Sequence, residues 1–281
     1  MSSTSALLDG DARMTAERSE TKYLVTAHQA AALVSEIERR LESHRHRGEG
    51  ANRLPDPQHY VTTIYFDTDS RALFRAAQAG ASHLKLRAKE YYDLHPGLTE
   101  TATDPRQLVR YQPTLWLELK SRDGEHSGKQ RIGVPKHDVP EFFARGEITS
   151  EMIAIQDASF GNEARRVLEA VAALCASCGE PLHADCLVNY RRQAWQDAAG
   201  ELRITLDRDL AFFRAPADLW IRDWALLRST LGSPVAKVAH RVLEVKHRAA
   251  PPSWLVELLA THAIVATPYS KFEAASSAIH G

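Results

Sequence analysis

The chain has 281 residues, of which 44% are hydrophobic and 25% are charged, a balance typical of a folded globular protein and not of a disordered one. The formal net charge is −1, which excludes an overall basic field for nucleic acid, so an anion site would depend on local clustering of the 35 Lys and Arg residues. No apolar run predicts a membrane-spanning helix, and the N-terminus lacks the basic start and apolar core of a signal peptide. We therefore expect a cytoplasmic protein without nucleic-acid or membrane partners.

Residues 1–15 are small and polar without periodicity, which predicts a disordered N-terminal tail. The remainder, residues 16–281, contains no linker that would divide it, so we expect a single domain. Its first element is a short strand over residues 18–25, with Arg18, Glu20 and Lys22 on one face. Thr26 then forms a capping box with Gln29 and begins a helix that the apolar spacing extends to about Ser43.

The next elements alternate between strand and helix signals. Residues 59–67 are rich in β-branched and aromatic side chains and predict a strand. Asp67 and the polar residues after it predict the cap of a short helix over 71–79, a more ordinary role for Asp67 than that of a ligand. In the strand predicted over 84–89, Lys85, Arg87 and Lys89 share one face.

Residues 115–134 predict a β-hairpin with a charged face. On its first arm Leu115, Leu117 and Leu119 alternate with Trp116, Glu118 and Lys120, and on its second arm Lys129 and Arg131 again share a face. The intervening RDGEHSG has the residues that a turn requires.

The last half of the chain repeats this pattern after a helical region at 138–174. Further strands are predicted at 187–195, 201–207 and 241–246, and they carry Arg192, Arg203, Glu244 and Lys246 opposite aliphatic faces. A helix begins at Pro251, and the last helix follows residues 269–272.

Each charged strand by itself is compatible with an ordinary antiparallel sheet whose polar face meets water. The repeated pairs of Lys, Arg and Glu, together with aliphatic faces suited to packing helices, instead favour an α+β fold: a closed antiparallel β-barrel with helices packed outside and a charged interior. Such an interior requires a charged ligand, and the excess of Lys and Arg predicts a phosphate-bearing anion.

The carboxylates among these bases have two possible roles. Glu20, Glu118 and Glu244 either form ion pairs with neighbouring bases or supply oxygen ligands for Mg²⁺ or Mn²⁺, and Glu244 is the best metal candidate. The chain contains neither a G-x-x-x-x-G-K-[ST] loop nor a strand-linked G-x-G-x-x-G. Nucleotide chemistry would therefore rely on side chains.

The three cysteines suggest little chemistry. Cys175, Cys178 and Cys186 contain one C-x-x-C with His183 nearby, so a zinc site is conceivable by residue type. The spacing is poor for zinc, and reduced, buried thiols are the favoured interpretation.

From residue 18 to residue 272 the motifs and their order resemble the VTC domain, the polyphosphate polymerase branch of the triphosphate tunnel metalloenzymes (CYTH-like superfamily). The motifs are R-x-E-x-K-Y-L-V at 18–25, Y-F-D-T at 65–68, K-L-R at 85–87, E-L-K at 118–120, K-Q-R at 129–131, Y-R-R-Q-A-W at 190–195, L-R-I-T-L-D at 202–207, V-L-E-V-K at 242–246 and S-K-F at 270–272. Arg18 stands where the wider superfamily has the first Glu of E-x-E-x-K, which favours the polymerase branch.

The resemblance implies an eight-stranded antiparallel tunnel that binds a triphosphate and a divalent metal. It assigns catalytic phosphate contacts to Lys22, Arg87, Arg192, Arg203 and Lys271, with Arg192 preferred over Arg191. Further phosphate binding falls to Lys85, Lys120, Lys129, Arg131, Lys246 and Ser270, and the metal, Mn²⁺ or Mg²⁺, to Glu244, with Glu118 and Glu20 as additional candidates.

The implied activity is a metal-dependent phosphotransferase that moves the γ-phosphoryl group of ATP to a growing polyphosphate chain. Two alternatives stay open at this point. One is an inorganic or nucleoside triphosphatase of the same fold, and the other is a non-catalytic module that binds polyphosphate or inositol polyphosphates. The oligomeric state is not predicted.

Overall fold

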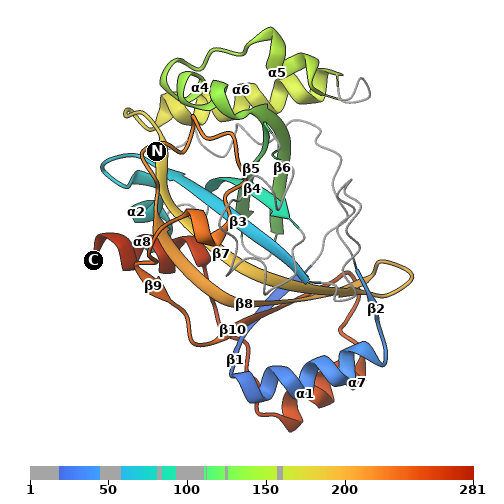
Figure 1. The fold of residues 1–281 in the computed structure, drawn as a ribbon. Helices are drawn as coiled ribbons and strands as arrows, with labels where there is room; N and C mark the ends of the chain where they lie inside the picture. The colour runs from blue at the N-terminus through green and yellow to red at the C-terminus, as the bar shows by residue number, and fades with distance from the viewer. Residues whose placement is uncertain are drawn as a thin grey trace.

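The computed structural model describes residues 19–44, 58–80, 84–92, 111, 113–123, 126–156 and 161–281. The predicted tail at 1–15 and Arg18 lie outside these ranges. Within them the chain forms an α+β fold around one ten-stranded sheet (Figure 1). Its strands are β1 (Ser19–Val25), β2 (Glu42–Ser43), β3 (Gln58–Asp67), β4 (Lys85–Tyr92), β5 (Thr114–Asp123), β6 (His126–Pro135), β7 (His183–Gln196), β8 (Leu202–Arg214), β9 (Ala236–Lys237) and β10 (Arg241–His247).

The principal path of the sheet runs β1-β10-β8-β7-β3-β4-β5-β6, and every pairing along it is antiparallel. The short strands β2 and β9 pair with β7 and β8, respectively. The first and last thirds of the sequence therefore meet in one sheet, since β1 and β8 both pair with β10.

The predicted closure of the sheet into a barrel is not found. Among the described residues no pairing joins β6 to β1, and the free edge of β1 is instead occupied by the C-terminal segment. Tyr23 bridges to Ala266, and the backbone N–H of Thr267 donates to the carbonyl oxygen of Lys22 at 2.8 Å. Because these groups are already satisfied, β1 has less backbone left with which to close the sheet.

The sheet is nevertheless strongly curled. Glu20 on β1 and Lys120 on β5 are separated by six strand spacings along the path, or about 29 Å if the sheet were flat. Their side chains are in fact 3.3 Å apart, between Lys120 Nζ and Glu20 Oε2. One face of the sheet is thus turned in on itself, and the other faces most of the helices.

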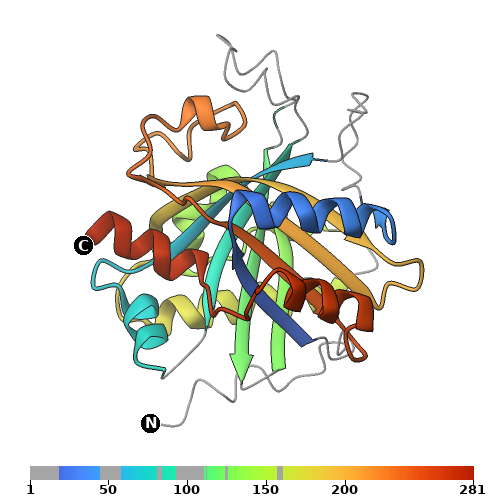
Figure 2. The same ribbon diagram turned by 90° about the horizontal axis from the view of Figure 1, so that it is seen from below.

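Helices pack on the sheet in two groups. Around the β3–β7 half lie α2 (Ala72–Gln78), α4 (Val139–Arg145), α5 (Ser150–Ala154), α6 (Gly161–Ser177) and α8 (Lys271–His280). Of these, α8 lies against the inner face, because the ring of Phe272 stacks at 5.2 Å on that of Tyr65, the cross-strand partner of Arg87. The helices α1 (Ala27–Glu38) and α7 (Ser253–Thr261) lie side by side over the β1, β8 and β10 half. Figure 1 shows the α4–α6 group and the α1–α7 pair at opposite ends of the molecule, and Figure 2, seen from below, has the α1–α7 pair in front of the sheet. The described residues also form two short 3₁₀ helices, η3 (Lys136–Asp138) and η4 (Arg228–Thr230).

The alternation predicted for the hairpin is confirmed, with Leu115, Leu117 and Leu119 at most 5% exposed in the larger core. Asp67 is confirmed as a cap. Its two carboxylate oxygens accept the backbone N–H groups of Leu73 and Phe74 at 2.9 Å each. Both observations follow from local patterns.

Several predicted boundaries are wrong, most of all the end of the first helix and the end of β8. The first helix ends at Glu38 and not near Ser43, because Glu42 and Ser43 pair with β7 as β2. Strand β8 continues to Arg214, seven residues past its predicted end at Asp207, because β7 and β9 supply partners for the extra length. In both cases tertiary pairing overrides the local signal.

Candidate functional site

Charged side chains from seven strands and one helix gather on the inner face of the curled sheet. Strand alternation and cross-strand register bring them together from β1, β4, β5, β6, β7, β8 and β10, and the first residue of α8 adds one more. We name this set the cationic face: Lys22, Lys85, Arg87, Lys89, Lys120, Lys129, Arg131, Arg192, Arg203, Lys246 and Lys271.

Two rows of cross-strand partners on this face run across β4, β5 and β6, and we call each row a rung. In the first, Lys85 pairs in register with Lys120, and Lys120 pairs with Lys129. Lysines directly opposite one another repel, so this rung is unfavourable for the protein alone and favourable for a bound anion. Lys129 is the exposed member of the rung, while the side chains of Lys85 and Lys120 are 19% and 21% exposed.

The second rung centres on Glu118, which lies in register between Arg87 and Arg131. Glu118 Oε2 is 2.7 Å from Arg87 Nη2 and 3.1 Å from Lys89 Nζ, and Glu118 Oε1 is 3.8 Å from Arg131 Nε. Burial, the largest single effect, favours the protonated acid, but the surrounding cations outweigh it and hold the pKa of Glu118 well below its usual range. The side chain is 1% exposed, and its contacts are those of the ion-pair alternative.

Glu20 and Glu244 form a second acidic centre. The ammonium group of Lys246 lies between them, 3.1 Å from Glu20 Oε2 and 3.0 Å from Glu244 Oε1. Glu20 also lies 3.2 Å from Lys22 Nζ and 3.3 Å from Lys120 Nζ. Burial and the neighbouring Glu244 carboxylate raise the pKa of Glu20, but the three lysines outweigh them and lower it to about 2. The two carboxylates are therefore ionised and close together.

A third cluster joins β7, β8 and α8. Asp207, which is fully buried, accepts from Arg192 Nε at 2.6 Å and Arg192 Nη2 at 2.7 Å, and Lys271 Nζ lies 2.7 Å from the same carboxylate. Both cations also lie over the ring of Tyr190, at 5.3 Å for Arg192 and 5.0 Å for Lys271. These contacts fix the two cations before any ligand arrives.

The neighbouring Arg191 lies on the opposite face of β7. Its Nε is 2.9 Å from Asp209 Oδ2, and its guanidinium lies 5.7 Å from the centroid of the Tyr60 ring. The preference for Arg192 over Arg191 thus agrees with the position of each side chain.

The start of α8 is tied to the first rung. Lys85 Nζ donates to Ser270 Oγ at 2.7 Å and to Glu273 Oε1 at 2.9 Å, and Lys22 Nζ donates to the carbonyl oxygen of Tyr269 at 3.1 Å. Ser270 is the N-cap of α8, because its hydroxyl accepts the backbone N–H of Glu273 at 3.2 Å. Ser270, predicted to bind phosphate, therefore has a structural task as well.

The cations proposed from the sequence lie on this one face of the sheet. Arg203 is among them, because it lies in register with Lys246 on β10. The structure adds three residues that the site prediction did not include. Lys89 lies two positions after Arg87, and Asp207 lies four positions after Arg203, so each shares a strand face with a predicted site residue. Alternation alone could therefore have indicated both. Glu273 could not have been found this way, because only the approach of α8 to β4 places it there.

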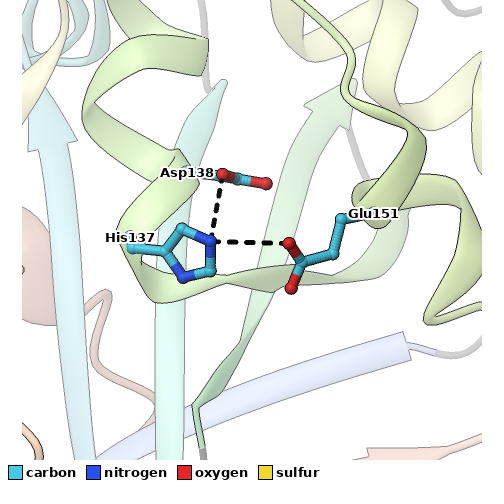
Figure 3. Close-up of side chains that lie close together, drawn as sticks. All are labelled: His137, Asp138 and Glu151. Carbon is cyan, nitrogen blue, oxygen red and sulfur yellow. Dashed lines mark ion pairs between the residues drawn. The ribbon is translucent and has the colours of Figure 1, made fainter.

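A different group of metal-type ligands occurs on the outer layer. His137 Nε2 lies 3.3 Å from Asp138 Oδ1 and 3.6 Å from Glu151 Oε2, as Figure 3 shows. Within the described ranges these residues form the group of three whose ligand atoms lie within 4.8 Å of one another. His137 and Glu151 are more than half exposed, which is typical of a surface ion pair, and none of the three belongs to the cationic face.

The cysteines agree with the favoured interpretation. All three are free, and Cys175 and Cys186 are buried. Burial raises the pKa of Cys175 to about 12, which keeps the thiol protonated and poorly reactive.

Fold and site together define an α+β protein whose curled antiparallel sheet carries a partly enclosed cationic face. The family model of the VTC domain matches residues 17–280, and the chain belongs to this family. The VTC domain is associated with polyphosphate and with phosphotransferase enzymes. No curated protein matches the chain. In the part of the chain that the structure describes, no helix is long and apolar enough to cross a membrane.

Proposed function

We propose that the protein is a metal-dependent polyphosphate polymerase that transfers the γ-phosphoryl group of ATP to phosphate or to the end of a polyphosphate chain. The observation that carries this proposal is the convergence of cations from seven strands and α8 on one inner face. Three carboxylate centres, at Glu118, at Asp207 and at the Glu20–Glu244 pair, hold these cations in place without neutralising all of them.

The reaction requires positioning and charge stabilisation more than covalent chemistry by the protein. The bond from the γ-phosphorus to the oxygen that bridges the β-phosphate breaks, a terminal oxygen of the acceptor bonds to that phosphorus, and ADP leaves. The acceptor oxygen is already anionic, so no protein base has to remove a proton. Arg87 and Arg192, each fixed by a buried carboxylate, are suited to hold the transferring group, because a guanidinium contacts two phosphate oxygens at once.

The Glu20–Glu244 pair fits a divalent cation. Mg²⁺ and Mn²⁺ prefer carboxylate oxygens and are commonly held by one or two carboxylates together with substrate phosphates. The ammonium group of Lys246 lies between these two carboxylates, and this arrangement supports the assignment because it places a positive charge between them. Glu20 and Glu244 would hold the divalent ion, and its positive charge would offset the negative charge that develops on the phosphate during transfer. Glu118 is the poorer candidate, because it is a single carboxylate, 1% exposed, whereas Glu20 and Glu244 offer two carboxylates beside each other.

The direct test is to incubate the pure protein with ATP and Mn²⁺ and to resolve the products on a gel. We expect ADP and a polyphosphate ladder. Orthophosphate without a ladder would identify a triphosphatase. Polyphosphate binding that needs no metal and is unchanged in Glu244→Ala, without ATP turnover, would identify a binding module.

A further inference from the structure

We propose that Trp116 is the stacking platform for the nucleobase of a nucleoside triphosphate whose phosphates lie on the cationic face. The inference rests on the proposed function and adds to it the residue that would distinguish a nucleotide from inorganic triphosphate.

Trp116 is a large apolar side chain on a charged face. Alternation along β5 places it on the same side as Glu118 and Lys120, while the leucines between them are buried on the other side. It is 40% exposed and is the aromatic member of the exposed large hydrophobic side chains in the described ranges. An indole left this open next to a site is a candidate contact for a flat apolar group.

Arg131 holds the indole from one side. Its guanidinium carbon lies 4.2 Å from the centroid of the Trp116 ring and 5.8 Å from that of Tyr91, while its Nε is 3.8 Å from Glu118. A guanidinium at this distance covers one ring face, so the exposed area lies elsewhere on the indole. Arg131 thus links the aromatic residue to the phosphate-binding rung.

The strand neighbours of Trp116 differ on its two sides. In register, Trp116 lies between Lys89 on β4 and Gly133 on β6. Gly133 has no side chain of its own, and a Cβ added there would approach Thr114 Cγ2 to 3.1 Å and Gln156 Oε1 and Ile155 Cδ1 to 3.9 Å. The β6 side of Trp116 is therefore bordered by Thr114, Gln156 and Ile155, and the indole is still 40% exposed.

The spacing along β5 suits a nucleotide. Lys120, Glu118 and Trp116 succeed one another on the inner face at intervals of about 7 Å, two residues at a time. A triphosphate held at the rungs of Lys120 and Arg87 would leave its nucleoside at the next position, which is Trp116. The opposite end of the face has the Glu20–Glu244 pair, so the site has an aromatic end and a carboxylate end.

The experiment compares ATP with inorganic tripolyphosphate, which has the phosphates but no base. Dissociation constants for both ligands would be measured by titration calorimetry for the wild type, Trp116→Ala, Trp116→Phe and Trp254→Ala. Trp254 is a matched control, because Arg40 lies 5.2 Å over its ring in the outer α1–α7 pair. We expect Trp116→Ala to weaken ATP binding about tenfold and tripolyphosphate binding less than twofold, with Trp116→Phe recovering most of the loss. Trp254→Ala should leave both constants unchanged.

Equal weakening of both ligands in Trp116→Ala would overturn the inference, because it would show that the indole acts only by placing Arg131. Unchanged ATP binding in this variant would overturn it too. ATP binding that depends on Trp116 without a polyphosphate ladder would support the platform while contradicting the polymerase. A ladder formed equally well by wild type and Trp116→Ala, with the same KM for ATP, would support the polymerase and contradict the platform.

Discussion

Arg192 and Arg191 are adjacent in sequence, yet a strand puts them on opposite faces and gives them unlike surroundings. Arg192 meets a fully buried carboxylate and the ring of Tyr190, whereas Arg191 pairs with Asp209 on the outer face. The pair therefore provides an internal comparison of the same side chain with and without access to the proposed phosphates.

At the residue scale, we expect Arg192→Ala to lower the initial rate of ADP formation from ATP at least a hundredfold, and Arg191→Ala to stay within about twofold of wild type. Removing Arg192 also takes away the bidentate partner of the buried Asp207 and leaves its ion pair with Lys271, so the free energy of unfolding should fall by about 3 kcal/mol. Arg192→Lys keeps the charge but loses the planar guanidinium that contacts two oxygens at once, so its rate should lie between those of Arg192→Ala and the wild type. Similar rates for Arg191→Ala and Arg192→Ala would contradict the assignment of the inner face.

At the scale of a single element, the start of α8 combines two tasks at Ser270, which caps the helix and accepts from Lys85. The outer helix α5 has a comparable cap, since Thr149 Oγ1 accepts the backbone N–H of Met152 at 3.1 Å and donates to Asp138 at 2.9 Å. The two caps allow the helix contribution to be separated from any contribution to binding.

We expect Ser270→Ala and Thr149→Ala each to lower the free energy of unfolding by about 1 kcal/mol, measured by urea denaturation. Only Ser270→Ala should also weaken tripolyphosphate binding, because it removes a proposed phosphate contact and leaves Glu273 to hold Lys85 at the first rung. If both variants bind tripolyphosphate as the wild type does, Ser270 is a cap alone and its predicted phosphate role is wrong.

Several elements were predictable from sequence because their causes are local. The capping box of Thr26 and Gln29, the Asp67 cap and the alternation of the β5–β6 hairpin depend on residues close in the chain. The end of α1 and the length of β8 were not predictable, because each depends on a strand that is distant in sequence.

At the scale of the whole molecule, the curl of the sheet sets the charge state of the lysines it encloses. Lys120 on β5 is buried against Glu20 on β1, and burial, with Glu20 and Glu244 partly opposing it, lowers the pKa of Lys120 to about 8. A flat sheet would leave this ammonium group in water.

Because Lys120 is charged below its pKa and neutral above it, we expect the affinity for tripolyphosphate to fall as the pH rises through about 8. The dissociation constant measured between pH 6.5 and 9.5 should show this inflection for the wild type. Lys120→Arg should bind the anion across the whole range, because arginine stays protonated. The same inflection in Lys120→Met would show that another group is responsible.

The sequence by itself determined most of the long strands, the side on which their charges lie, and a family resemblance that the VTC domain match confirms. These depend on side-chain alternation and on the order of short motifs, which a chain displays before it folds. The tertiary structure alone decided that the sheet curls without closing, that α8 joins the face, and that Glu118 is surrounded by cations while Glu20 and Glu244 share Lys246. Those outcomes depend on distances between residues far apart in the chain, and the burial that shifts their pKa values exists only once the sheet has curled.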